Sequence, residues 1–342
     1  MDNLSVIEED CISICKKIDF STLDGKSVLI TGASGLLGVY FLTCLKQLNE
    51  LGINVKVIAI FRSELPDYFL LRDFSNLQIF KGDITDYNFC QTLPPADLII
   101  HAEGYGQPMK FMEEPEKTLK LNTFSTFLLF DKLKPQGHFL FISSSEVYSG
   151  LKKSIYTEDD IGITNTTYPR ACYIEGKRGG EAICNAYRSK GVKASSIRLA
   201  HTYGPGTKKG DKRVILSFIE KALNGKIELL DDGKAIRTYC YIADAIEIMW
   251  RVLLTGKQPI YNLGGNSHTS IAGLAQNIGD IFKVPVIVPT IGNGVSGAPE
   301  DVKLDMSKTE NEFGEINYTT LNTGLQRTIK WYLAINKNEQ NR

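Results

Sequence analysis

Up to about residue 203, short apolar runs alternate with longer segments in which apolar residues recur every three or four positions. The short runs are typical of buried strands, and the longer segments are typical of amphipathic helices. Strands are predicted at residues 27–31, 55–61, 77–81, 97–102, 138–142 and 194–199, and helices include residues 36–51, 115–133 and 174–190. This regular alternation predicts an α/β fold built on a doubly wound parallel sheet.

The two ends of the chain lie outside this alternation. Residues 4–18 have the pattern of a short amphipathic helix, which predicts an N-terminal helical arm over residues 1–24. The parallel sheet is predicted to occupy residues 25–203. Beyond residue 203 the pattern is less regular and richer in glycine. Residues 204–335 are therefore predicted to form mainly a smaller C-terminal lobe, with room for segments that return to the first domain.

The first predicted strand runs directly into a glycine-rich turn, Thr31-Gly32-Ala33-Ser34-Gly35-Leu36-Leu37-Gly38. In such a turn the first glycine allows the sharp bend, the second lets the backbone approach a pyrophosphate, and the third lets the next helix pack on the strand. The amino-terminal end of that helix then faces the phosphates. This spacing predicts a dinucleotide-binding (Rossmann) domain. The predicted cofactor contacts are Gly32, Ser34, Gly35, Leu36, Leu37 and Gly38.

A second motif places a phenol and an ammonium group four residues apart, at Tyr173 and Lys177. Residues at positions i and i+4 share one face of a helix. Free tyrosine has a pKa near 10, too high for a base at neutral pH, but a neighbouring cation stabilises the phenolate and lowers that pKa. The pair is therefore suited to removing a proton from a sugar or alcohol hydroxyl.

A third motif follows the strand predicted at residues 138–142, which ends in Ser143-Ser144-Ser145-Glu146. Ligands bind at the carboxyl ends of the strands in a parallel sheet. A serine at this place can hydrogen-bond both the reacting oxygen and Tyr173, which would fix the geometry of hydride and proton transfer. Ser145 and Glu146 are predicted to take part in catalysis or to contact the substrate.

Together these three motifs resemble the extended branch of the short-chain dehydrogenase/reductase family, the NAD-dependent nucleotide-sugar epimerases, dehydratases and decarboxylases. The resemblance covers roughly residues 25–332. It implies that Tyr173 is the catalytic base, that Lys177 lowers its pKa and holds the nicotinamide ribose, and that Ser144 is the hydroxyl partner. Residues 169–178, Pro-Arg-Ala-Cys-Tyr-Ile-Glu-Gly-Lys-Arg, most closely resemble the UDP-glucuronate decarboxylases.

The type of nicotinamide cofactor depends on the end of the second strand. NAD-binding sheets usually carry an Asp or Glu there, whereas this chain has Phe61-Arg62-Ser63. Arg62 and Ser63 could bind the 2′-phosphate of NADP, while the family resemblance favours a tightly held NAD, so NAD is predicted with NADP as the alternative. Further predicted cofactor contacts are Arg62, Asp83, Ile84 and Ala102.

The substrate that the resemblance implies is a nucleotide-diphosphate sugar. Arg237 lies in a segment that resembles the part of the family whose arginine holds the pyrophosphate, and guanidinium groups bind phosphate oxygens bidentately. Arg213 ends a basic loop that begins at Lys208, and a solvated turn is an equal alternative for that loop. The predicted substrate-binding residues are Arg170, His201, Arg213 and Arg237.

Three positions bear on the reaction. The family usually has an asparagine where this chain has His201. The decarboxylases use an arginine to face the uronate carboxylate, and Val302 aligns there, although Lys303 could substitute. The 4,6-dehydratases carry an Asp-Glu pair after the catalytic hydroxyl, whereas this chain has Ser145-Glu146, the decarboxylase arrangement, and a serine is a poor acid for expelling water.

The predicted function is oxidation of a nucleotide-linked sugar at C4, followed by decarboxylation as in a UDP-glucuronate decarboxylase. Dehydration by a 4,6-dehydratase, return of hydride by a 4-epimerase and release of the ketone by a C4 dehydrogenase remain alternatives. A catalytically silent NAD(P)-binding sensor is an alternative of another class. The resemblance also predicts a homodimer formed through the helices near residues 115–133 and 174–190.

The composition of the chain limits its possible binding partners and its cellular compartment. The 342 residues carry 39 basic and 39 acidic side chains, so no overall charge favours nucleic acid or a membrane surface. No run of eighteen or more apolar residues occurs. The seven cysteines show neither a CxxC pair nor zinc spacing, so no metal is predicted, and their odd number favours reduced thiols in the cytoplasm.

Overall fold

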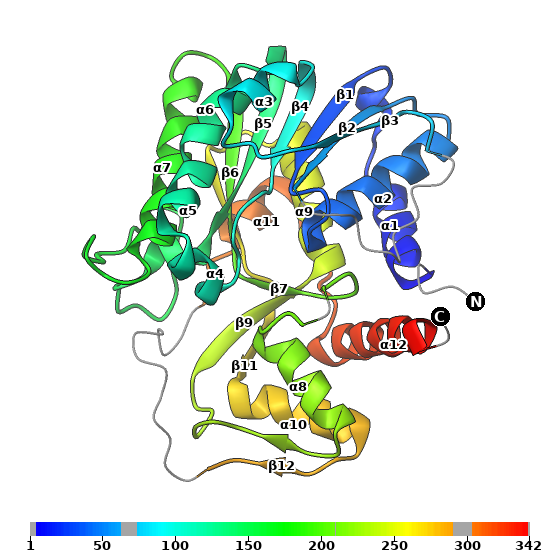
Figure 1. The fold of residues 1–342 in the computed structure, drawn as a ribbon, viewed down its shortest axis with the longest axis vertical. Coiled ribbons are helices and arrows are strands. Elements are labelled where there is room, and N and C mark those ends of the chain that lie inside the picture. Colours follow the sequence, from blue (N-terminus) through cyan, green and yellow to red (C-terminus); the bar gives the residue numbers. More distant parts are fainter. Residues whose placement is uncertain (1–4, 63–73, 209, 290–302, 341–342) are drawn as a thin grey trace.

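The computed structural model describes residues 5–62, 74–208, 210–289 and 303–340. Its centre is a seven-stranded parallel sheet in the order β3-β2-β1-β4-β5-β6-β10 (Figure 1). The strands are β1 (Ser27–Thr31), β2 (Lys56–Phe61), β3 (Leu77–Lys81), β4 (Ala96–His101), β5 (Leu133–Ser144), β6 (Lys193–Leu199) and β10 (Ile260–Leu263). The predicted doubly wound α/β fold is confirmed.

Helices cover both faces of this sheet. One face packs against α1 (Ser5–Lys17), α2 (Leu36–Glu50) and α9 (Ile242–Thr255), and the other against α3 (Tyr87–Thr92), α4 (Pro108–Glu113), α5 (Pro115–Asn122), α6 (Phe124–Phe130) and α7 (Ala171–Arg188). In β1, Val28 and Ile30 enter the first core while Leu29 enters the second. Successive strand residues point to opposite faces, so a strand buried on both sides needs the continuous apolar run that the sequence shows.

A smaller lobe lies below the main sheet in Figure 1. Its three-stranded sheet has the order β11-β9-β7, and β12 pairs with β8. The lobe contains β7 (His201–Tyr203), α8 (Val214–Leu223), β8 (Ile227–Glu228), β9 (Ile236–Tyr241), β11 (Ser267–Ser270), α10 (Ile271–Phe282), β12 (Val286–Ile287) and α12 (Leu321–Gln340). Between β9 and β11 the chain returns to the main sheet, because β10 pairs with β6. Helix α11 (Ser307–Phe313) comes later in the chain and contacts β10 of the main sheet.

Two element predictions differ from the structure. The helix predicted over residues 115–133 is wrong in its continuity: α5 and α6 are separate helices, and β5 already begins at Leu133. The break falls at Thr123, whose hydroxyl donates to the carbonyl of Leu119 at 2.7 Å and whose φ of −116° departs from helical geometry. Threonine hydroxyls compete in this way with the backbone hydrogen bonds of a helix. Strand β10 was not predicted, because four residues give too short a pattern.

The N-terminal arm is built into the fold through one buried carboxylate. Asp10 of α1 accepts hydrogen bonds from Tyr40 at 2.9 Å and from Tyr241 at 2.7 Å. It also forms an ion pair with Arg327 of α12 at 2.8 Å. A single side chain thus links the arm, the helix after the glycine turn, the lobe and the C-terminal helix. No helix within the described ranges combines the length and hydrophobicity that a membrane span requires.

Candidate active site

The glycine turn lies where the sheet changes direction. From β1 the chain builds outward to β2 and β3, and β4 then pairs with the other side of β1, Thr31 opposite His101. Doubly wound sheets bind ligands at such a switch point, beyond the carboxyl ends of the strands. The first residues beyond these two strands, Gly32 and Ala102, therefore face each other at the place where a ligand is expected.

The backbone at this turn has no room for side chains. Gly32 has a φ of +66°, and a Cβ there would lie 2.9 Å from the carbonyl oxygen of Ala102. A Cβ on Gly38 would lie 2.5 Å from the Cα of Ala33. Helix α2 begins after Gly35 without a side-chain cap, so the first N–H groups of this helix point toward the turn. Leu36 and Leu37 pack partly against the core, and Ser34 is buried.

The structure brings Ser144, Tyr173 and Lys177 together. Ser144 ends β5, and its hydroxyl hydrogen-bonds the phenol of Tyr173. The Lys177 ammonium lies 5.7 Å from the centre of the Tyr173 ring and donates to the carbonyl of Ile142 at 2.7 Å. Phe111 stacks on Tyr173 at 4.6 Å between ring centres. The helix spacing and the strand end thus produce the cluster that the motifs predicted.

Burial dominates the protonation of this cluster. Desolvation raises the pKa of Tyr173 to about 12, although the hydrogen bond from Ser144 lowers it and Glu146 raises it further. Desolvation also lowers the pKa of Lys177 to about 7, against the opposing effect of Glu181. Lys177 is not among the groups that chiefly shift the pKa of Tyr173. The nearby cations that lower the pKa of Tyr173 are instead arginines, Arg170 and Arg213.

Glu146 and Arg170, which were predicted for different roles, form an ion pair with each other. Both Arg170 Nε and Nη2 donate to the Glu146 carboxylate, the Nε contact at 3.2 Å. Ser145 and Glu146 belong to a short 3₁₀ turn over Ser145–Tyr148, and the Ser144 hydroxyl accepts the backbone N–H of Glu146 at 3.2 Å. The turn holds this carboxylate beside the catalytic cluster.

The four predicted substrate-binding residues gather in one region. Desolvation and then repulsion from Arg237, Arg213 and Arg170 lower the pKa of His201 to about 4, although the residue as a whole is exposed. Arg213 forms a bidentate pair with Asp211, with Nη2 2.7 Å from Oδ2. The half-buried Arg237 donates to the carbonyl of Ile236 at 2.6 Å. At neutral pH the region is cationic through its arginines, with a neutral histidine.

Arg62, Asp83 and Ile84, the predicted cofactor contacts after β2 and β3, are held by neighbouring side chains. Arg62 donates to the hydroxyl of Tyr105 at 2.9 Å. Asp83 pairs with Lys117 at 2.7 Å, and this pair together with bonds from Thr85 outweighs desolvation and lowers the pKa of Asp83 to about 2. Ile84 is completely buried, so its side chain supports the site from within the core. Ser63 lies outside the described residues.

Three site residues were missed or left open by sequence reasoning. Asn122 ends α5, and its buried Oδ1 has no hydrogen-bond partner among the described residues. A Cβ on Gly104 would lie 3.5 Å from Lys177 Nζ and 3.9 Å from that oxygen, so Asn122 and Lys177 approach the same point. Lys208 of the basic loop reaches Ser34 of the glycine turn at 3.5 Å. Glu103, two residues after β4, lies half-buried against the turn.

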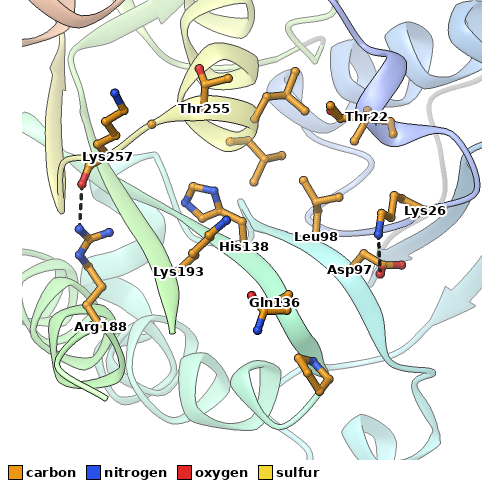
Figure 2. A pocket seen from close by; sticks show the side chains of 15 residues that line it. Thr22, Lys26, Asp97, Leu98, Gln136, His138, Arg188, Lys193, Thr255 and Lys257 are labelled. Carbon is orange, nitrogen blue, oxygen red and sulfur yellow. Dashed lines mark hydrogen bonds and ion pairs between the residues drawn. The ribbon is translucent and has the colours of Figure 1, made fainter. Parts of the chain in front are cut away.

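A distinct cavity of about 610 Å³ lies at the other edge of the sheet, where the strands begin (Figure 2). It is lined by residues such as Lys26, Asp97, His138 and Lys193, and none of the predicted site residues lines it. Val302, which aligns with the decarboxylase arginine, lies outside the described residues, and Lys303 is exposed. Within the described ranges, no group of three or more His, Cys, Asp or Glu residues is arranged to hold a metal ion.

A doubly wound sheet with a glycine turn at its switch point defines the Rossmann class of α/β proteins. The model of the NAD dependent epimerase/dehydratase family matches residues 28–264. The chain belongs to this family, and the predicted resemblance is confirmed.

Similar proteins in this family act on nucleotide sugars. UDP-glucuronic acid decarboxylase 1 of Xenopus tropicalis is 28% identical over 326 residues, which cover 91% of this chain and 73% of that protein. A dTDP-4-dehydro-6-deoxy-D-allose reductase of a Streptomyces species is 28% identical over 323 residues, covering 90% and 96%.

Solved structures show the same fold at lower identity. The UDP-glucose 4-epimerase of Thermotoga maritima, solved with UDP-glucose, has a TM-score of 0.77 at 22% identity and covers 90% of this chain and 99% of its own. A dTDP-glucose 4,6-dehydratase of Streptomyces venezuelae, solved with NAD, has a TM-score of 0.76 at 22% identity and covers 90% and 97%.

Proposed function

We propose that this protein oxidises the C4 hydroxyl of a nucleotide-linked sugar with NAD and then decarboxylates the 4-keto intermediate, as a UDP-glucuronate decarboxylase does. The observation that carries the proposal is the convergence of Ser144, Tyr173 and Lys177 at the carboxyl edge of the sheet, next to the glycine turn. A base, a hydroxyl that orients it and a cation are the groups that removal of a hydroxyl proton requires.

The residues present fit a nicotinamide dinucleotide. The missing Cβ atoms of Gly32 and Gly38 allow close approach of a pyrophosphate to the start of α2. Gly104 leaves space in front of the Lys177 ammonium, where a Cβ would lie 3.5 Å away. When bound, NAD supplies the hydride acceptor for oxidation of the sugar.

Each residue of the cluster then has a separate task. As a phenolate, Tyr173 accepts the proton of the sugar C4 hydroxyl and becomes the phenol, and the Ser144 hydroxyl fixes the direction of its oxygen. Because burial raises the pKa of Tyr173 to about 12, added positive charge must stabilise the phenolate during the reaction. The charges of Arg170 and Arg213 already lower the pKa of Tyr173. Lys177 lies close enough to add its own charge when it is protonated.

The arginines around His201 are the proposed diphosphate site. Arg237 and Arg213 act on His201 electrostatically and supply the planar donors that phosphate oxygens prefer. Arg213 is paired with Asp211, so it would bind phosphate while it is held in place by that carboxylate. Arg170 is the proposed contact to the sugar or its carboxylate, in exchange with Glu146.

A second candidate is reduction of a 4-keto nucleotide sugar, the reverse of C4 oxidation. Two observations favour it. The sequence has Val302 where a decarboxylase carries the arginine for its substrate carboxylate, and Arg170 is already paired with Glu146. The similarity to the dTDP-4-dehydro-6-deoxy-D-allose reductase also covers 96% of that protein. A reductase needs no cation for a uronate carboxylate.

Mass spectrometry of incubated nucleotide sugars separates these candidates. Purified protein would be incubated with NAD and UDP-glucuronate, with UDP-, dTDP-, GDP- and CDP-hexoses, and with a dTDP-4-keto-6-deoxyhexose plus NADH or NADPH. Loss of CO₂ from UDP-glucuronate supports decarboxylation, while a gain of two hydrogens on the keto sugar supports the reductase. If NAD binds and no sugar changes its mass, both candidates are replaced by a 4-epimerase, whose product has the same mass, by an enzyme for a sugar outside this set, or by the silent sensor.

We also propose a homodimer formed through α5, α6 and α7. Helices α5 and α6 expose apolar side chains, including Phe124 at 42% and Phe127 at 48% exposure. A second copy covering this face would remove them from water. Phe127→Glu is therefore expected to convert a dimer into a monomer in sedimentation equilibrium. Leu230→Glu, at an 87% exposed leucine of the lobe, is expected to leave the dimer intact. A wild-type monomer, or a dimeric Phe127→Glu variant, would contradict this interface.

The cysteines suggest the compartment. All seven are free thiols, and Cys15 and Cys172 are the two that are only partly buried. Disulfides form in oxidising compartments and are rare in the cytosol. We therefore propose a cytoplasmic location, where the thiols stay reduced.

A further inference from the structure

Within the described residues, the end of β2 lacks the carboxylate that usually binds the adenosine ribose of NAD. Arg62 occupies this position and interacts with Tyr105. Its guanidinium lies 5.4 Å from the centre of the Tyr105 ring and donates a hydrogen bond to the Tyr105 hydroxyl. That hydroxyl donates in turn to Glu114 at 2.9 Å. Arg62 is therefore held against the loop after β4, and among the described residues an acidic ribose ligand would have to come from another element.

Glu103 lies two residues beyond the end of β4, close enough to Arg62 for the two charges to interact. Its Cα would be 2.9 Å from a Cβ on Gly32, so it contacts the first glycine of the turn. Its backbone N–H donates to Thr31 at 3.1 Å, and its carboxylate accepts the backbone N–H of Gly32. Arg62 stabilises the charge of this carboxylate, and Asp83 opposes it. Glu103 thus connects the ends of β1, β2 and β4.

One oxygen of the Glu103 carboxylate accepts no hydrogen bond from the described part of the protein. Oε2 of Glu103 is buried and lacks a hydrogen-bond partner among the described residues. Buried polar atoms in folded proteins nearly always have a partner, and an exception points to a ligand or to a function. Desolvation, only partly offset by Arg62, raises the pKa of Glu103 to about 7, as expected for a carboxyl group that lacks donors.

We propose that Glu103 binds the adenosine ribose hydroxyls of the dinucleotide, in place of the acidic residue that is missing at the end of β2, and so selects NAD over NADP. The proposal rests on the dinucleotide binding proposed above. Ribose hydroxyls would supply the donors that Oε2 lacks. A 2′-phosphate at the same position would place a second negative charge against the Glu103 carboxylate, which disfavours NADP although Arg62 is near.

Calorimetric binding of NAD and NADP to the wild type and to Glu103→Gln tests this selection. Hydrogen bonds to a charged group are worth more than neutral ones, so the variant is expected to bind NAD roughly 10-fold or more weakly. It is expected to bind NADP more tightly than the wild type does, because a negative charge is removed. Glu50→Gln, at the far end of α2, removes an equal charge and is expected to change neither affinity.

ADP and 2′-deoxy-ADP locate the contact on the ribose. Removing the 2′-hydroxyl should weaken binding to the wild type on the order of 10-fold and should have little effect in Glu103→Gln. An unchanged NAD to NADP ratio in the variant, or tighter NAD binding in Glu103→Ala because the side chain obstructs the site, would overturn the role of Glu103 alone. A wild type that binds neither dinucleotide would overturn the proposed function as well. Circular dichroism checks that each variant is folded.

Discussion

Replacing Tyr173 with phenylalanine is expected to lower kcat by about three orders of magnitude, the middle of the range for loss of a general acid or base. The change removes the hydroxyl that bonds Ser144 and would accept the proton of the substrate. The measurement is the initial rate of product formation on the nucleotide sugar that the wild type converts. Binding of NAD, measured by calorimetry, is expected to change less than about twofold, because the deleted hydroxyl serves the reacting oxygen of the sugar and not the phosphates of the dinucleotide.

The structure explains why phenylalanine is a clean replacement. The ring of Tyr173 stacks on Phe111 with an angle of 13° between the planes, and a phenyl ring keeps that contact. Tyr187→Phe removes a hydroxyl from the same helix, where the ring stacks on Phe130, and is expected to keep the wild-type rate. If Tyr173→Phe retains more than about a tenth of the wild-type kcat, another group is the base.

Sequence reasoning located the parts of this site that local spacing determines. The glycine turn needs only a strand, three glycines and a helix, all within residues 27–50. Tyr173 and Lys177 share a helix face because they are four residues apart, and α7 spans both. The parallel sheet followed from the alternation of strands and helices. Each of these features depends on residues that are close together in the chain.

The other features depend on contacts between distant segments. The position of Glu103 against Gly32 depends on the pairing of β4 with β1, and Asn122 meets Lys177 only because α5 packs on α7. Protonation was the least predictable property. A lysine four residues from a tyrosine suggested a lowered phenol pKa, whereas burial raises it to about 12, and the extent of burial is not visible in a motif. No local pattern in the sequence points to the role proposed for Glu103.

The second large effect is expected at Arg198, which is buried behind the catalytic helix. Arg198 of β6 forms a bidentate pair with Glu181 of α7, with Nη2 2.9 Å from Oε2, and both side chains are at most 5% exposed. Its Nη1 also donates to the Tyr148 hydroxyl at 3.0 Å. Arg198→Ala is expected to lower the free energy of unfolding by about 3–5 kcal/mol, because Glu181 is left charged, buried and unpaired. Urea denaturation followed by circular dichroism measures the decrease.

An exposed ion pair provides the matched control for Arg198. Lys226 and Glu228 form a 3.0 Å pair in which both side chains are more than half exposed. Lys226→Ala is expected to cost less than about 1 kcal/mol, the usual value for surface pairs. A similarly small decrease in Arg198→Ala would contradict the argument from burial.

A double variant, Arg198→Met with Glu181→Leu, separates the cost of an unpaired charge from the cost of poorer packing. Removing both charges is expected to restore much of the stability, because apolar side chains of similar volume often replace a buried pair at little cost. Activity is expected to recover less than stability. Glu181 lies one turn beyond Lys177 on the same helix face and raises the pKa of that lysine, so its removal leaves the ammonium with less support. A double variant as unstable as Arg198→Ala would show that the arginine contributes through packing and its bond to Tyr148, and not through its charge.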